Sequence, residues 1–176
     1  MIRAVEIRKS FDETEVLKGI SMNFEKGKTN LIIGRSGAGK TVLLKLLVGL
    51  MEPTQGEVWY GNDNFSEMEK KQRRAIRMEV GMLFQGSALF DSMTVEENVR
   101  FPLDMFTSMT RKEKQKQVDY CLERVELVGA NKKFPSETSG GMQKRVALAR
   151  AIAGDPKVIF FDEPTTGLDP IMANVI

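Results

Sequence analysis

One eight-residue stretch constrains this chain more than any other. Its residues are Gly34, Arg35, Ser36, Gly37, Ala38, Gly39, Lys40 and Thr41. They match G-x-x-x-x-G-K-[ST], with a strand-like apolar run before them and a helical pattern after them. The glycines let successive backbone N–H groups face one point, and a helix N-terminus directs its partial positive charge there. The motif predicts a phosphate-binding loop, in which Lys40 reaches the outer phosphates and Thr41 offers its hydroxyl to Mg²⁺.

Composition sets the outer limits on what the chain does. It has 176 residues, of which 41% are hydrophobic and 28% charged, and this is ordinary for one globular domain. A net charge of +2 gives no indication of a nucleic-acid partner. The absence of histidine excludes His-based zinc sites and Ser-His-Asp triads, and a single cysteine, Cys121, excludes an intramolecular disulfide. The longest apolar stretch, Val42–Met51, is too short to cross a membrane.

Hydrophobic periodicity predicts alternating strands and helices. Strands are expected at Ile2–Arg8, Ile20–Glu25, Thr29–Ile33, Glu57–Tyr60, Val80–Gln85 and Val158–Phe161, with 29–33 read as buried. Helices are expected at Lys40–Gly49, inside the fold, at 63–79, on a solvated face, between 94 and 130, and at Arg145–Ala153. Two capping boxes, Thr94-x-x-Glu97 and Thr110-x-x-Glu113, mark helix starts.

A second group of polar residues follows the last apolar strand. Val158–Phe161 leads directly into Asp162 and Glu163. A carboxylate at the end of such a strand suits Mg²⁺ coordination, which we assign to Asp162. Glu163 is then placed to polarise an attacking water as a general base. Together with the phosphate loop, this pair indicates hydrolysis of a nucleoside triphosphate.

At this point the residues resemble one family, the nucleotide-binding ATPases of ABC transporters. Ser139, Gly140 and Gly141 look like the start of the family's signature loop, which caps the nucleotide held by a second subunit. Gln85 resembles the Q-loop glutamine, which touches Mg²⁺ and water and senses the membrane partner. Phe11 stands where the family places an aromatic ring under the adenine, with an ordinary loop residue as the alternative. Asp169 resembles the D-loop aspartate that crosses the dimer interface.

The resemblance implies an α/β fold of the P-loop NTPase type, with an N-terminal antiparallel β subdomain and a helical insert. It implies a β subdomain and P-loop core over 1–93, a helical subdomain over 94–138, and the signature helix, Walker B strand and D-loop over 139–176. ATP and Mg²⁺ are the expected cofactors, with Thr41, Asp162 and Gln85 organising the metal. The expected partners are a second copy, bound head to tail, and a transmembrane permease, with no nucleic acid.

The chain departs from the family pattern at two positions, and the second departure points to one branch. Thr138 replaces the usual Leu before the signature serine, and Met142 replaces the usual Gln after the glycines. The second departure, with segments 88–95 and 97–103, resembles the ATPases of Mla-type phospholipid transporters, which work with an MCE-domain lipid-binding protein. ATPases of amino-acid import and of lipoprotein release share many of these motifs and remain alternatives. So does a soluble ABC ATPase of translation or DNA repair, although the stretch between Gln85 and Ser139 shows no sustained heptads.

Apolar side chains gather in the sequence around Gln85. They are Met82, Phe84, Leu89, Phe90, Phe101, Met105 and Phe106. In the family this region receives a short helix of the membrane subunit, and flexible Met side chains suit a surface that repacks. Core packing of the helical lobe is the alternative for any one of them. The resemblance further implies a location on the cytoplasmic face of the membrane.

Given the resemblance, the absence of histidine also indicates how much of the family's domain is present. ABC ATPases carry a switch histidine some way beyond the D-loop, and this sequence has none. We therefore expect a chain truncated at its C-terminus, which binds nucleotide but hydrolyses ATP poorly alone.

Overall fold

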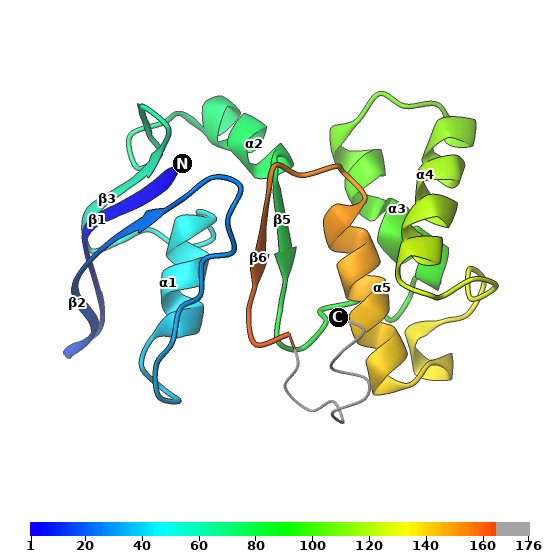
Figure 1. The fold of residues 1–176 in the computed structure, drawn as a ribbon, viewed down its shortest axis with the longest axis horizontal. Coiled ribbons are helices and arrows are strands. Elements are labelled where there is room, and N and C mark those ends of the chain that lie inside the picture. Colours follow the sequence, from blue (N-terminus) through cyan, green and yellow to red (C-terminus); the bar gives the residue numbers. More distant parts are fainter. Residues whose placement is uncertain (165–176) are drawn as a thin grey trace. The chain divides into compact units, whose positions relative to one another are not determined.

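The computed structural model describes residues 1–164 (Figure 1). Two compact units divide the chain, Met1–Arg77 and a second unit that starts at Met78. The boundary expected after residue 93 falls inside the second unit. The D-loop residue Asp169 lies outside the described residues.

The first unit is built on an antiparallel sheet. Its strands are β1 (Ile2–Phe11), β2 (Thr14–Phe24), β3 (Gln55–Tyr60) and β4 (Asp63–Asn64), in the order β2-β1-β3-β4. Ile2, Ala4 and Ile7 of β1 are buried, and so is Val58 of β3, which pairs with Ala4. The antiparallel N-terminal subdomain expected from the sequence is confirmed.

Two helices of opposite character complete this part of the chain. Helix α1 (Lys40–Leu47) buries four leucines, which are Leu43, Leu44, Leu46 and Leu47. The hydroxyl of Tyr60 on β3 donates to the Leu47 carbonyl at 2.9 Å, so sheet and helix are joined by a hydrogen bond as well as by packing. The solvated helix predicted over 63–79 is confirmed only as α2 (Lys70–Met78), which buries no residue, because Asp63–Asn64 form the short strand β4 instead.

The predicted strand at Thr29–Ile33 is wrong. These residues adopt no strand, and Leu31 and Ile33 are 78% and 86% exposed. The side chain of Asn30 accepts from the Glu25 N–H and donates to the carbonyls of Glu25 and Lys28, each at 3.1 Å. Such side-chain bonds to nearby backbone hold a turn and compete with a ladder. An apolar run also becomes a buried strand only where neighbouring strands cover it.

The second unit contains a two-stranded parallel sheet. Strand β5 (Val80–Leu83) pairs with β6 (Val158–Phe161), and Val80 lies opposite Val158 and Leu83 opposite Phe161. Both strands were predicted, and β6 has the predicted bounds. Because the strands are parallel and in register, the residues that follow them leave the sheet at the same edge.

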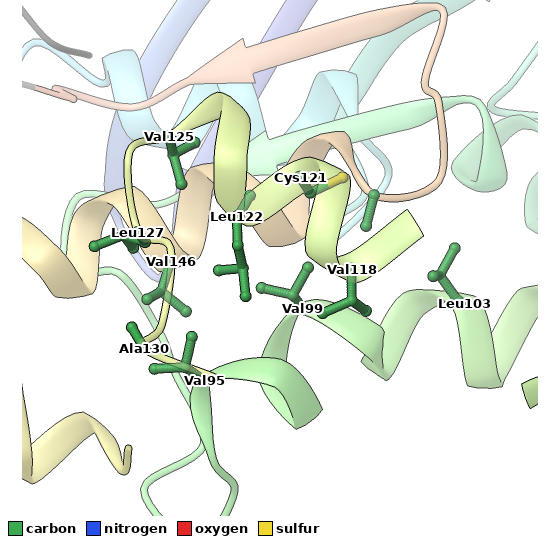
Figure 2. Packing of buried hydrophobic residues seen from close by; sticks show 12 residues of the cluster. Val95, Val99, Leu103, Val118, Cys121, Leu122, Val125, Leu127, Ala130 and Val146 are labelled. Carbon is green, nitrogen blue, oxygen red and sulfur yellow. The ribbon is translucent and has the colours of Figure 1, made fainter. Parts of the chain in front are cut away.

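Three long helices form the main core of this unit. They are α3 (Val95–Phe106), α4 (Arg111–Arg124) and α5 (Gly140–Ile152), with a short 3₁₀ turn η1 (Pro135–Glu137) before α5. Figure 2 shows side chains of these helices turned toward one another, among them Val99, Val118 and Leu122. Cys121 is 1% exposed in this cluster, and burial raises the pKa of its thiol to about 11. An inert, packed thiol is therefore its role in the fold.

The predicted helix starts at Thr94 and Thr110 are confirmed. The N–H of Thr94 donates to Glu97 at 2.8 Å, and the N–H of Glu97 donates back to the Thr94 hydroxyl at 3.4 Å. Thr110 and Glu113 make the same reciprocal pair at 2.7 and 3.3 Å. Each box satisfies backbone donors that the first turn of a helix leaves free.

Helix α5 packs closely on β5. A Cβ on Gly81 of β5 would lie 2.5 Å from the Ala151 carbonyl of α5, so only glycine allows this approach. The helix predicted at Arg145–Ala153 begins earlier than expected, at Gly140, and its last turn contacts β5. Among residues 1–164, no helix combines the length and apolar character that a membrane span requires.

Candidate functional site

The phosphate loop is exposed and ends at the first turn of α1. Residues 34–38 are all exposed. The ammonium of Lys40 donates to the carbonyls of Gly34 and Arg35, at 3.1 and 3.2 Å. The Ala38 N–H donates to the Arg35 carbonyl at 3.1 Å. The chain thus curls around the lysine, as the motif predicts.

Two glycines shape this loop through their left-handed backbone. Gly37 and Gly39 have φ of 77° and 87°, a region that costs other residues roughly 1–2 kcal/mol each. Gly39 is the N-cap of α1, and within the described residues no side chain caps this N-terminus. Its first N–H groups are therefore suited to an anion, which fits a phosphate.

In the second unit, the parallel register brings Gln85 and Glu163 together. Gln85 lies two residues beyond β5, and Glu163 two residues beyond β6. The Gln85 amide donates from Nε2 to Glu163 Oε2 at 3.0 Å. Between β6 and Glu163, Asp162 is 3% exposed, and its N–H donates to the Leu83 carbonyl at 2.9 Å. Three of the predicted site residues therefore share one sheet edge.

The turn that carries Glu163 is held by α5. Glu163 has a φ of 48°, an uncommon conformation for a residue with a side chain. Lys144 of α5 is 9% exposed and donates from Nζ to the carbonyl of Pro164, the next residue, at 3.2 Å. A buried lysine thus fixes the backbone beside the predicted general base.

The predicted signature residues begin α5. The Ser139 hydroxyl accepts from the Met142 N–H at 3.2 Å, which makes Ser139 the N-cap of the helix. Ser139 and Gly140 are exposed, and a Cβ on Gly140 would find nothing within 4 Å. Ser139, Gly140 and Gly141 thus expose a helix N-terminus, which favours anions such as phosphate.

The remaining predicted residue with a described position is Phe11, at the end of β1. Its ring is 41% exposed, and the Lys9 ammonium lies 5.3 Å from the ring centroid. An exposed ring is available for stacking on a base, and its role under an adenine stays a prediction. Phe11, Lys40 and Thr41 belong to the first unit, while Gln85, Asp162, Glu163 and the signature residues belong to the second.

The family model that describes the ABC transporter matches residues 17–166. This chain belongs to the ABC transporter ATP-binding family. The match includes the phosphate loop, the sheet edge with Gln85, Asp162 and Glu163, and the start of α5. It therefore covers every predicted site residue except Phe11 and Asp169.

Known relatives and solved structures agree with this assignment. The intermembrane phospholipid transport system ATP-binding protein MlaF of Haemophilus influenzae is 43% identical over 161 residues, covering 92% of this chain and 61% of that protein. The chloroplastic protein TRIGALACTOSYLDIACYLGLYCEROL 3 of Arabidopsis thaliana is 40% identical, covering 100% and 53%. The sulfate/thiosulfate import ATP-binding protein CysA 1 of Agrobacterium fabrum is 39% identical, covering 96% and 48%. The chain thus spans about half to three fifths of these relatives' length.

Among solved structures, a dimeric bacterial ABC transporter cassette superposes with a TM-score of 0.93 at 33% identity, covering all of this chain and 79% of that one. A post-hydrolysis state of an ATP-binding cassette, bound to ADP and Pi, gives a TM-score of 0.91 at 33% identity. These likenesses confirm the predicted fold class.

Sequence reasoning missed two residues that hold the segment after Gln85. Asn98 of α3 is fully buried, and its amide bonds the backbone of Phe90, Met93 and Thr94. Arg150 of α5 donates to the carbonyls of Ser87 and Ala88, both at 2.8 Å. The signal for Asn98 was an amide between Val95 and Val99 on an apolar helix face. Arg150 gave no comparable local signal.

Part of the apolar group around Gln85 is exposed. Phe90, Met105 and Phe106 are 40%, 51% and 37% exposed, and the Phe90 ring lies 4.7 Å from that of Phe101, centroid to centroid. Leu103, on the same helix as Met105, is buried. The exposed members suit a docking surface, and the groove for a membrane subunit stays a prediction.

Proposed function

We propose that the whole protein is the ATP-binding and ATP-hydrolysing subunit of a membrane ABC transporter. The observation that supports this most directly is the Gln85–Glu163 contact beside buried Asp162, at 3.0 Å, in a chain that also carries the phosphate loop. Lys40 and the loop N–H groups would hold the phosphates. Phosphoryl transfer needs positioning and charge neutralisation more than covalent chemistry, and these groups supply both.

The residues assigned to Mg²⁺ fit that ion. Thr41, Asp162 and Gln85 carry hydroxyl, carboxylate and amide oxygens, the hard ligands that Mg²⁺ prefers. Within the described residues, no three carboxylate, His or Cys side chains gather into a metal cluster. Proteins usually hold Mg²⁺ through one or two carboxylates and substrate phosphates, and Asp162 would be such a carboxylate. The ion would neutralise charge on the phosphates, while Glu163 would accept a proton from the attacking water.

Two copies would act together in this proposal. Ser139, Gly140 and Gly141 of one copy would close over the nucleotide held by the other, and Asp169 would cross their interface. The relative with the dimeric structure supports two copies as the working form. The exposed apolar residues Phe90, Met105 and Phe106 would meet the membrane subunit. The proposed location of the ATPase is the cytoplasmic face of the membrane.

The proposed cargo is phospholipid, moved with an MCE-type partner. The 43% identity to a phospholipid-transport ATP-binding protein supports this, together with Met142 after the signature glycines. The sulfate importer relative, at 39% identity over 96% of the chain, makes import of a small solute the competing assignment. Purification of the complex from native membranes, followed by mass spectrometry of the co-purified subunits and lipids, separates the two.

The role of Glu163 is tested by Glu163→Gln in the full-length protein assembled with its membrane subunit. ATP binding should persist, and phosphate release should fall at least about a hundredfold, the usual contribution of a general base. Glu79→Gln is the matched control, because Glu79 precedes β5 at the opposite end of the sheet and pairs on the surface with Lys157 at 2.6 Å. Unchanged phosphate release by Glu163→Gln would contradict the proposal.

A further inference from the structure

The segment after Gln85 has a backbone that needs support from outside. Ser87 and Ala88 have φ of 59° and 49°, two consecutive non-glycine residues in the left-handed region. Each such residue costs roughly 1–2 kcal/mol, and neither has a glycine's freedom to adopt it. Residues held in this way persist only where the surroundings impose the conformation.

That support comes from Arg150. Its Nη2 donates to the Ser87 carbonyl and its Nη1 to the Ala88 carbonyl, both at 2.8 Å. The two nitrogens of one rigid, planar guanidinium thus bind two successive carbonyls, a geometry that a lysine ammonium does not reproduce. Ser87 is 6% exposed, so its carbonyl bond is made at a largely buried residue. Burial lowers the pKa of the guanidinium, which nonetheless stays charged at neutral pH.

The position of Arg150 on α5 makes this contact specific. Gly81 admits the Ala151 carbonyl against β5, so the residue next to Arg150 is packed on the strand that leads into the loop. On the same helix, Lys144 holds the Pro164 carbonyl next to Glu163. Helix α5 therefore fixes both backbone segments whose side chains meet in the Gln85–Glu163 hydrogen bond.

We propose that Arg150 is a positioning residue for Gln85, which locks the left-handed Ser87–Ala88 turn so that the Gln85 amide is presented to Glu163. The proposal rests on the role given to Gln85 under the proposed function. It assigns Arg150 no contact with nucleotide. Its effect on turnover should therefore pass entirely through Gln85.

The direct test measures amide hydrogen exchange in this chain and does not depend on activity. Arg150→Met keeps much of the aliphatic stem and removes both donors. The N–H groups of Ser87, Ala88 and Phe90, which bond Phe84, Gly86 and Asn98, should exchange at least about tenfold faster. Arg150→Lys should fold if the methionine variant does not, and it should also accelerate exchange because one ammonium replaces a two-nitrogen fork. Wild-type exchange at all three amides would overturn the proposal.

Arg145 supplies a matched control on the same helix. Its Nη1 lies 3.4 and 3.3 Å from the carbonyls of Val125 and Glu126, so it too binds two successive carbonyls. Arg145→Met should accelerate exchange at Glu126 and Leu127 and leave Ser87 and Ala88 at their wild-type rates. Faster exchange at Ser87 and Ala88 in this variant would show general loosening of α5 and contradict a specific role for Arg150.

A double-mutant cycle in the full-length protein tests the connection to Gln85. Arg150→Met should lower kcat and leave the KM for ATP unchanged. Combined with Gln85→Ala it should lower kcat no further than Gln85→Ala alone. If the double variant instead loses kcat by the product of the two single losses, Arg150 does not act through Gln85 and the proposal is wrong. Full turnover by both Glu163→Gln and Gln85→Ala would instead refute the roles given to these two residues under the proposed function, and the exchange result would still decide whether Arg150 holds the loop.

Discussion

The phosphate loop and the Gln85 loop reach unusual backbone conformations by opposite means. In the phosphate loop, Gly37 and Gly39 adopt positive φ, and Lys40 bonds carbonyls of its own loop. In the Gln85 loop, Ser87 and Ala88 adopt positive φ without glycine and are held by hydrogen bonds from Arg150, while the Asn98 amide bonds the backbone that follows, from Phe90 to Thr94. A loop shaped by glycine is disrupted by adding atoms to it. A loop shaped by distant side chains is disrupted by removing atoms elsewhere.

The largest effect should come from removing the Asn98 amide. Asn98→Ala removes a fully buried amide with its four hydrogen bonds and leaves the Phe90 N–H without its acceptor, so it should lower the free energy of unfolding by about 3 kcal/mol. Urea unfolding measures the loss. Asn98→Asp is the matched variant, because it keeps an acceptor for Phe90 but donates nothing to the three carbonyls. If Asn98→Ala is as stable as wild type, the claim that distant side chains shape the Gln85 loop is contradicted.

An intermediate effect should come from adding one methyl group to the phosphate loop. In Gly39→Ala the new Cβ would lie 2.7 Å from Leu17 Cδ2, in addition to the left-handed strain, so we expect a loss of about 2 kcal/mol. Gly37→Ala meets nothing within 4 Å and should lose only about 1 kcal/mol, from strain alone. Thermal unfolding of the two variants side by side gives the difference. Equal losses would show that contact with β2 does not shape the loop.

The smallest effect concerns the capping box that starts α3 after the Gln85 loop. The Thr94 N–H, followed by the Thr94 hydroxyl, lowers the pKa of Glu97 below its ordinary value of 4.5. Because the folded-state pKa is depressed, the stabilisation is present above about pH 4.5 and is lost as pH falls through the folded pKa. Glu97→Gln should therefore be less stable than wild type at pH 7, and the difference should narrow as the pH falls below 4.5, as urea midpoints would show. A gap that is unchanged at pH 3 would contradict this origin.

Local patterns predicted the local structure of this protein well. The glycine motif predicted the loop and the start of α1, the capping boxes predicted the starts of α3 and α4, and Val158–Phe161 was predicted with its observed bounds. In each case the residues that determine the conformation lie within a few positions of it. The same reasoning gave Thr29–Ile33 as a strand and was wrong, because burial of an apolar run depends on neighbours elsewhere in the chain.

The sequence by itself determined the family, the phosphate loop and the types of the catalytic candidates. Only the tertiary structure decided that Gln85 bonds Glu163, because that contact depends on the register of β5 against β6. Likewise, the bonds of Arg150 to Ser87 and Ala88 arise from the packing of α5 on Gly81 of β5. A backbone turn is set by the preferences of adjacent residues. A side chain that reaches across more than sixty positions is placed by strand pairing and helix packing, which no short pattern contains.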